Sequence, residues 1–219
     1  MERSGWERVD SYLNGRLLGD DPVLDAVLRA NQDAGLPAID VSEAQGKFLH
    51  LMVLATGARR VLEVGTLGGY STIWLARAVG AGGRVVTLEM DDLHADVAAA
   101  NFERAGMADR IDLRRGPALR TLPHLEGGPA FDLVFIDADK PNNLAYLQWA
   151  IRLSRRGAVV IVDNVVRRGG VADTASNDPS IRGTRAMLDW IAGNPALTAT
   201  GMQTVGAKGW DGFVMAVVA

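Results

Sequence analysis

FDLVFIDADK (Phe131–Lys140) is an apolar run that ends abruptly in Asp137, a second acid and a lysine. A second run of this kind, GAVVIVDNVV (Gly157–Val166), ends in Asp163 and Asn164. Short apolar runs bounded by polar residues are typical of strands buried in a parallel sheet. Two such strands ending side by side would bring two carboxylates and an amide oxygen together. This all-oxygen set suits a hard cation such as Mg2+.

Strand-like runs alternate with helical segments along most of the chain, which predicts an α/β fold with a mainly parallel sheet and helices on both faces. The connection Gly206–Asp211 is too short for a crossover helix, so the last strand is expected to be antiparallel. The seven expected strands are Arg60–Gly65, Arg84–Met90, Ile111–Arg115, Phe131–Ala138, Ala158–Asp163, Leu197–Val205 and Gly212–Val218. Helices are expected at Gly69–Val79, Asp91–Ala105, Ala118–Leu125, Lys140–Leu153 and Pro179–Ala192.

Three further helical stretches precede the first strand, at Gly5–Leu18, Pro22–Ala34 and Ser42–Ala55. The third begins Ser42-Glu43-Ala44-Gln45, which matches a capping box: Ser42 and Gln45 would each bond the backbone amide of the other. The chain has no internal repeat, low-complexity tract or interdomain linker. Residues 1–219 are therefore expected to form one domain, in which residues 1–57 are a helical cover or a subunit interface.

The bulk composition excludes several functions. The formal net charge is −3 and the pI about 5.6, so there is no global attraction to nucleic acid or to anionic membranes. Absence of cysteine excludes disulfides, thiolate nucleophiles and cysteine-ligated metals. The amino terminus has no apolar signal core and no uncharged stretch reaches membrane-spanning length, which predicts a cytoplasmic location. His50, His94 and His124 lack metal-ligand spacing, and His50 and His94 are interpreted as structural.

VLEVGTLGGYS (Val61–Ser71) combines a strand, a glycine-rich turn and the start of a helix. Glycines there let the backbone approach a ligand, and the helix presents free amides. A dinucleotide loop would have glycine where this chain has Glu63, so a cationic or hydroxyl-rich ligand fits better than a diphosphate. Glu89 ends the next strand, where an acid can accept both ribose hydroxyls. The two features together predict a nucleoside site.

These motifs together resemble one family. Glu-x-Gly-x-x-x-Gly after the first strand, an acid after the second, Asp-Ala-Asp-Lys and Asp-Asn are similar to the cation-dependent O-methyltransferases, which include catechol and caffeoyl-coenzyme A O-methyltransferases. The resemblance runs from about Val41 to the carboxyl terminus. It implies a Rossmann-like class I methyltransferase fold, S-adenosylmethionine as cofactor, a dication (Mg2+, or Mn2+ or Ca2+) and a homodimer.

The resemblance also implies residue roles. Asp137, Asp163 and Asn164 would hold the dication, and Lys140 would touch the substrate and accept its proton. A free lysine has a pKa of about 10.4 and is a poor base when protonated, but burial and a nearby dication both favour the neutral form. Asp139 would bind the methionine amino group of the cofactor. The full set of expected cofactor contacts is Val41, Glu63, Gly65, Thr66, Ser71, Glu89, Ala118, Asp137 and Asp139.

The chain departs from the plant enzymes of the family after Asp-Asn. Those enzymes typically continue Thr-Leu-Trp-Asn-Gly, whereas this chain has Arg168 at the position of the substrate-contacting asparagine. This difference puts coenzyme A ester substrates in doubt. Arg167 or Arg168 either attracts an acidic group of the acceptor or is a plain surface arginine. The loop Arg167–Asp178 is a candidate lid. Trp210 is expected in the last hairpin turn, at the rim of the pocket or away from it.

The predicted activity is metal-dependent methyl transfer from S-adenosylmethionine to a hydroxyl of a vicinal dihydroxy aromatic small molecule. One rival is methylation of a hydroxylated uridine in transfer RNA, which the acidic pI and the lack of a basic stripe disfavour. A second rival is a nicotinamide-dependent oxidoreductase, which Glu63 disfavours. A third is a non-catalytic S-adenosylmethionine-binding protein, which is hard to reconcile with Lys140 and the three metal ligands.

Overall fold

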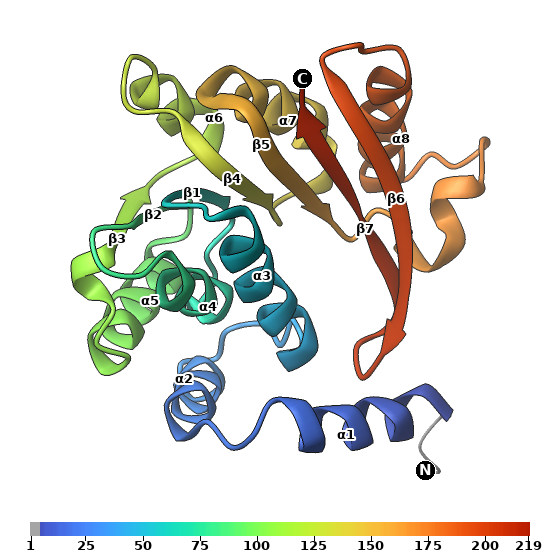
Figure 1. The fold of residues 1–219 in the computed structure, drawn as a ribbon. Helices are drawn as coiled ribbons and strands as arrows, with labels where there is room; N and C mark the ends of the chain where they lie inside the picture. Colours follow the sequence, from blue (N-terminus) through green and yellow to red (C-terminus); the bar gives the residue numbers. More distant parts are fainter. Residues whose placement is uncertain (1–4) are drawn as a thin grey trace.

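The computed structural model describes residues 5–219, which contain one seven-stranded sheet in the order β3-β2-β1-β4-β5-β7-β6 (Figure 1). β1 to β5 run parallel, and β7 is antiparallel to both of its neighbours, β5 and β6. The strands are β1 (Arg60–Val64), β2 (Arg84–Glu89), β3 (Ile111–Arg115), β4 (Phe131–Ile136), β5 (Ser154–Asp163), β6 (Leu197–Gly206) and β7 (Gly209–Val218). The expected α/β fold with an antiparallel last strand is confirmed.

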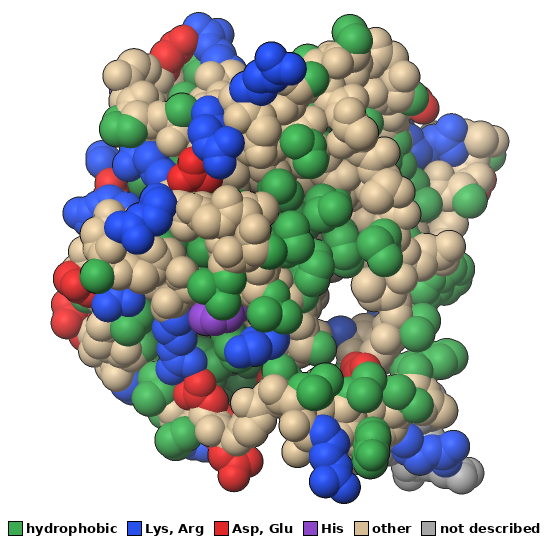
Figure 2. Space-filling model, in the orientation of Figure 1, with side chains coloured by type: hydrophobic (Ala, Val, Ile, Leu, Met, Phe, Trp, Pro, Cys, Tyr) green, Lys and Arg blue, Asp and Glu red, His purple; other side chains and the backbone are tan. Residues whose placement is uncertain are grey.

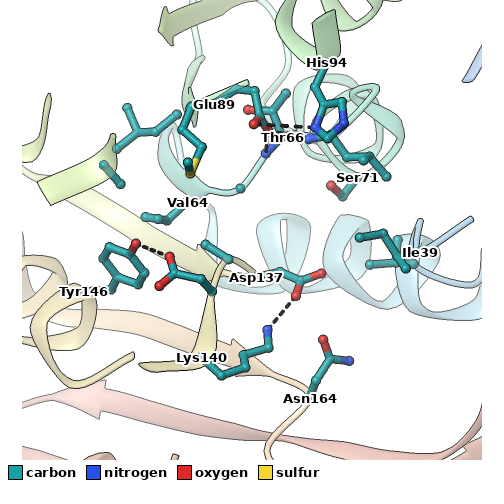
Figure 3. A pocket seen from close by; sticks show the side chains of 18 of the residues that line it. Ile39, Val64, Thr66, Ser71, Glu89, His94, Asp137, Lys140, Tyr146 and Asn164 are labelled. Atoms are coloured by element: carbon teal, nitrogen blue, oxygen red, sulfur yellow. Dashed lines mark hydrogen bonds and ion pairs between the residues drawn. The ribbon is translucent and has the colours of Figure 1, made fainter. Parts of the chain in front are cut away.

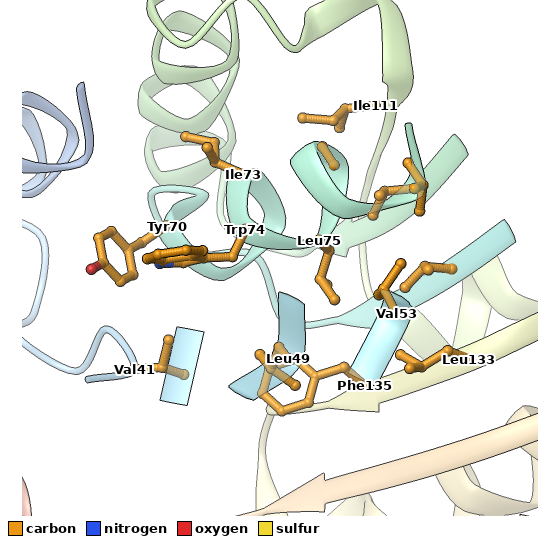
Figure 4. Packing of buried hydrophobic residues seen from close by; sticks show 14 of the residues in the cluster. Val41, Leu49, Val53, Tyr70, Ile73, Trp74, Leu75, Ile111, Leu133 and Phe135 are labelled. Carbon is orange, nitrogen blue, oxygen red and sulfur yellow. The ribbon is translucent and has the colours of Figure 1, made fainter. Parts of the chain in front are cut away.

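Helices cover both faces of the sheet, so the central strands are apolar on both sides. In β4, Leu133 and Phe135 pack into one core cluster, while Val134 and Ile136 pack into the other. Figure 4 shows the first cluster, in which Trp74 and Leu75 lie above Leu49 and Phe135. On this face lie α3 (Glu43–Thr56), α4 (Tyr70–Val79) and α5 (Asp92–Arg104); α6 (Ala118–Thr121), α7 (Asn143–Leu153) and α8 (Pro179–Ala192) contribute to the other.

The amino-terminal helices α1 (Gly5–Leu17) and α2 (Pro22–Asp33) precede α3. α1 has no buried residue and crosses the far end of the β6–β7 hairpin, where the Ala207 amide donates to Asp10 Oδ2 at 2.8 Å (Figure 1). Figure 2 shows an opening between this hairpin and the body of the molecule, closed on one side by α1. Residues 1–4 of the expected helical cover lie outside the described part. Within residues 5–219, no helix is long and apolar enough to cross a membrane.

The strands near the carboxyl terminus differ from the sequence predictions in three details. β5 begins at Ser154 rather than Ala158, because its register with β4 shifts and Phe131 pairs with Ser154. The last hairpin is tighter than expected: β6 and β7 pair as far as Gly206 and Gly209. Trp210 therefore lies in a strand, opposite Val205, and not in the turn.

The first turn of the expected Lys140–Leu153 helix is the 3-10 helix η3 (Lys140–Asn142), which contains Pro141. The expected Ala118–Leu125 helix is α6 followed by the 3-10 helix η2 (Leu122–Leu125), and η1 (Ala108–Arg110) precedes β3. The candidate lid begins with η4 (Arg167–Ala172). Movement of this loop stays a prediction.

Candidate active site

A cavity of about 480 Å3 lies at the carboxyl ends of the parallel strands. The chain moves outward from β1 to β2 and β3 and then returns to place β4 on the other side of β1. A crevice forms at such a reversal, and it is the usual ligand site of open α/β sheets. The expected residues that line the cavity are Val41, Gly65, Thr66, Ser71, Glu89, Ala118, Asp137, Asp139, Lys140 and Asn164.

The glycine-rich turn after β1 forms one wall of this cavity. Gly65 has a φ of +98°, and a Cβ there would overlap the backbone carbonyl oxygen of Asp137. Only glycine lets the turn pass this close to the end of β4. The amides of Thr66 and Leu67 donate to Glu89 Oε2 at 3.1 and 2.8 Å. Glu89 therefore fixes the turn through Oε2, while Oε1, which accepts from the Asp91 amide at 3.0 Å, retains a lone pair for a ligand hydroxyl.

Glu63 lies behind the wall and not in the cavity lining, because its side chain is fully buried. Ser71 Oγ donates to one carboxylate oxygen at 2.6 Å, and Thr87 Oγ1 donates to the other at 2.7 Å together with Thr72 Oγ1. Burial raises the pKa of Glu63 to about 7, and the nearby charge of Asp137 adds to the shift against the lowering effect of the three hydroxyls. Glu63 is thus linked to the cavity by its hydrogen bond with Ser71, which is one of the lining residues.

Asp139 lies opposite Tyr146, whose hydroxyl donates to Oδ1, while Asn142 Nδ2 donates to Oδ2 at 2.6 Å. Burial raises the pKa of Tyr146 well above its usual value, and the hydrogen bond to Asp139 adds to the shift. Tyr146 and His94 both line the cavity, and neither was predicted as a site residue. Figure 3 shows His94 beside Glu89, where Nδ1 lies 3.7 Å from Oε1.

Lys140 and Asp137 form a partly buried ion pair in the lining of the cavity. Nζ of Lys140 lies 2.8 Å from Asp137 Oδ1, and the lysine side chain is only 7% exposed. Figure 3 shows the side chain of Asn164 facing the same space from below. Asn164 adopts a φ of +55°, a conformation that asparagine tolerates better than most residues.

Asp163 ends β5 and is buried, with 4% of its surface exposed. Burial raises the pKa of its carboxyl, and the charge of Asp137 raises it further, so the two carboxylates lie close enough to repel. Gln45 Nε2 donates to Asp163 Oδ2 at 2.6 Å. The expected capping box is therefore half wrong: Ser42 Oγ accepts from the Gln45 amide at 3.2 Å, but the Gln45 side chain bonds Asp163 instead of Ser42.

The donor chemistry of Asp137, Asp163 and Asn164 fits a hard dication. Two mutually repelling carboxylates and an amide oxygen supply the oxygen ligands that Mg2+ prefers, and a dication would offset the repulsion. Among residues 5–219, no group of three His, Cys, Asp or Glu side chains is placed to hold a metal. The set of Asp137, Asp163 and Asn164 is not such a group, because asparagine is not one of these four residue types.

A second cavity, of about 760 Å3, opens beside the first between α3, the β6–β7 hairpin and the loop after β5. Asn164 and Arg167 line both cavities, and Asp163 and Arg168 line the second. Its apolar wall includes Phe48, Phe213 and Trp210. The two phenylalanine rings have centroids 5.1 Å apart.

The loop that joins the two cavities is held in a strained conformation. Asn164, Arg167 and Arg168 all have φ near +55°. Asp211 Oδ1 accepts from the amides of Val166 at 2.9 Å and Arg167 at 3.1 Å, so the start of β7 fixes this loop. Such strain persists where the surroundings over-determine it, commonly at functional sites. Asp211 was not predicted as a site residue.

The strand order β3-β2-β1-β4-β5-β7-β6 with an antiparallel β7, together with the glycine-rich turn after β1 and the acid that ends β2, is that of the Rossmann-like methyltransferases. Comparison with known proteins agrees with this class: a family model described as O-methyltransferase matches residues 17–204. The catechol O-methyltransferase of Mycobacterium tuberculosis is 60% identical over 210 residues, which cover 96% of this chain and 94% of the relative. The catechol O-methyltransferase of Niastella koreensis is 46% identical over 220 residues, which cover both proteins completely.

A solved structure is also similar to this chain over nearly the full length of both. The O-methyltransferase from Bacillus cereus in complex with SAH superimposes with a TM-score of 0.96 at 55% identity, over 98% of each chain. The chain belongs to the O-methyltransferase family, and it is an S-adenosylmethionine-dependent O-methyltransferase.

Proposed function

We propose that this enzyme transfers the methyl group of S-adenosylmethionine to one hydroxyl of a catechol-like small molecule with the help of a divalent cation. One observation carries the proposal: the candidate cation ligands lie at the junction of two cavities. Asp137 lines the first, Asp163 lines the second, and Asn164 lines both. A cation held there would touch an acceptor in the second cavity and remain beside a cofactor in the first. The catechol O-methyltransferase names of the two curated relatives support this acceptor class.

The first cavity is the proposed cofactor site. Glu89, at the end of β2, is placed to accept ribose hydroxyls, and Ser71 and Thr66 are polar groups beside the glycine-rich turn. Val41 and Ala118 form an apolar part of the wall of this cavity. Asp137 and Asp139 supply negative charge toward a ligand that carries a sulfonium and an ammonium. Glu63 acts from behind this wall, by holding Ser71.

When bound, S-adenosylmethionine would supply a methyl group on a sulfonium, and a divalent cation would favour ionisation of an acceptor hydroxyl. Asp137, Asp163 and Asn164 would hold the cation. A cation on Asp137 would weaken the ion pair of that carboxylate with Lys140, and Lys140 Nζ would then take the acceptor's proton and hold it until release to solvent. The methyl group would pass from the sulfur of the cofactor to the acceptor oxygen. The side chain of Lys140 is only 7% exposed, which limits the access of water to Nζ.

The direct test is transfer of a labelled methyl group to a catechol and to the matched monophenol, with Mg2+ and with EDTA. We expect transfer to the catechol alone, lost in EDTA and restored by excess Mg2+. Equal transfer in EDTA would refute the metal dependence. Cofactor binding without transfer to any catechol would refute the acceptor class, and transfer to transfer RNA in its place would establish the nucleic-acid rival.

Three cationic side chains of the second cavity favour an acidic catechol. Its lining includes Arg167, Arg168 and Lys208, and none of the three forms an ion pair with a side chain of residues 5–219. The lining also holds the carboxylates of Asp10, Asp163, Asp178 and Asp211, which accept hydrogen bonds from amides and keep their negative charge. An acidic group of the acceptor would therefore be bound by one of the three cations and not by the overall charge of the cavity.

Replacing Arg168 with methionine tests this preference. We expect kcat/KM for a catechol carboxylate to fall several-fold more than kcat/KM for neutral catechol, because a rim charge contributes about 1 kcal/mol or less. Arg156→Met is the control, since Arg156 is exposed at the opposite end of β5. Equal effects on both acceptors would leave Arg168 as a plain surface arginine.

The enzyme is further proposed to act as one domain and as a homodimer. Trp6, Tyr12 and Leu17 are exposed apolar residues on α1, at 46%, 64% and 73%, which supports burial against a second copy. Light scattering after size exclusion would test it, and a monomer at micromolar concentration would refute it.

A further inference from the structure

Gln45 is the polar side chain that links the amino-terminal helices to the candidate cation site. Its Nε2 lies 2.6 Å from Asp163 Oδ2, across 118 residues of sequence. The donor must be the amide nitrogen, because an ionised carboxylate only accepts hydrogen bonds. The bond engages one of the two Asp163 oxygens and leaves the other for a ligand.

The position of Gln45 is fixed by two further contacts of α3. Its backbone amide donates to Ser42 Oγ at 3.2 Å, which caps the first turn of α3. One turn further along α3, the ring of Phe48 packs against Phe213 at 5.1 Å between centroids. Phe213 is the residue that pairs with Asp163 between β5 and β7. Residues three apart share one face of a helix, so α3 presents Phe48 and Gln45 to neighbouring points of the sheet.

Asp163 needs such a partner because its carboxylate is buried and faces the charge of Asp137. A free carboxylate could rotate about its last bond, which is broad in energy. The Gln45 amide removes this freedom by fixing one oxygen. Groups that hydrogen-bond a metal ligand from behind commonly change metal affinity by 10- to 100-fold when they are removed.

We infer that Gln45 is a positioning residue, which orients the Asp163 carboxylate for the divalent cation. The inference rests on the proposed metal dependence. It gives α3, which precedes β1 in the chain, a part in the reaction. Gln45 also lines the second cavity, so the test measures cation affinity without an acceptor, which a role in acceptor binding alone would not change.

The test is Mn2+ affinity, measured by electron paramagnetic resonance of free Mn2+ in the presence of SAH. Gln45→Met keeps the volume of the side chain and removes the donor, and Gln45→Ala removes both. Gln148→Met is the matched control, because Gln148 is exposed on α7. We expect at least a 10-fold rise in the Mn2+ Kd for both Gln45 variants and none for the control.

Two further readouts separate positioning from a general loss of structure. We expect the SAH Kd measured without metal to change less than about 2-fold in Gln45→Met, and saturating Mg2+ to restore most of kcat. An unchanged Mn2+ Kd in Gln45→Met, beside a wild-type enzyme that binds Mn2+, overturns the inference alone. A wild-type enzyme that binds no dication overturns the proposed function, and this inference with it.

Discussion

Replacing Glu63 with glutamine should flatten the pH dependence of stability in the cofactor-free enzyme. Glu63 is fully buried, and its pKa in the folded protein is raised to about 7 from 4.5, chiefly by burial. Glutamine has nearly the same shape and carries no charge. Ser71, Thr72 and Thr87 can all reverse their hydrogen bonds, because a hydroxyl both donates and accepts.

The sign follows from which state holds the proton more tightly. Below pH 4.5 the carboxyl is protonated in both states and contributes nothing. Between pH 4.5 and 7 the unfolded chain loses the proton first, so the free energy of unfolding falls as pH rises. Above pH 7 the carboxyl is ionised in both states, and the full cost of burying its charge lowers the free energy of unfolding. The pKa difference corresponds to about 3 kcal/mol in total, most of which develops between pH 5 and pH 8.

Urea unfolding followed by tryptophan fluorescence measures this directly at a series of pH values. We expect Glu63→Gln to gain about 2 to 3 kcal/mol relative to wild type between pH 5 and pH 8. Glu103→Gln is the control, because Glu103 is exposed on α5. Parallel pH profiles for wild type and Glu63→Gln would refute the reasoning and mean that Glu63 is ionised in the folded protein throughout this range.

Two other substitutions test the site. Lys140→Met should lower kcat by about 100-fold or more and leave the SAH Kd within a few-fold, because a general base contributes 10²- to 10⁴-fold; a kcat within 3-fold of wild type would remove Lys140 from the mechanism. Gly65→Ala should lower the free energy of unfolding by more than the roughly 1–3 kcal/mol of a strained backbone, because its Cβ would overlap the Asp137 carbonyl. Gly57→Ala, at a φ of +64° with open space around it, is the control, and equal melting temperatures for the two variants would contradict the close approach.

The sequence predicts the sheet well because each strand is decided locally. In the run that ends in Asp137, successive side chains point to opposite faces of the strand, and both faces are apolar. Only a central strand between two helical layers buries both faces of such a run. The position of Asp137 and Asp163 at strand ends then follows from the lengths of these runs. Asn164 lies at the same edge of the sheet because it directly follows Asp163 in the sequence.

The features that escape prediction depend on contacts distant in sequence. The Ser42–Gln45 pattern predicts a local capping box, but the Gln45 side chain gains a charge-assisted hydrogen bond to Asp163, which is stronger than a neutral one. Glu63 is predicted to meet the cofactor, and only the three-dimensional fold reveals the hydroxyls of two other elements around it. Trp210 was predicted in the hairpin turn but lies in β7. Gly206 and Gly209 can each end a strand, and the local sequence does not show which residues form the turn.

The central claim is that a dication lies between the ends of β4 and β5. It is tested most directly by anomalous scattering from Mn2+ in crystals grown with SAH. The account predicts one strong peak within bonding distance of oxygens of Asp137, Asp163 and Asn164. A peak bound elsewhere on the protein, or none in crystals of an enzyme that still transfers methyl groups, would contradict it.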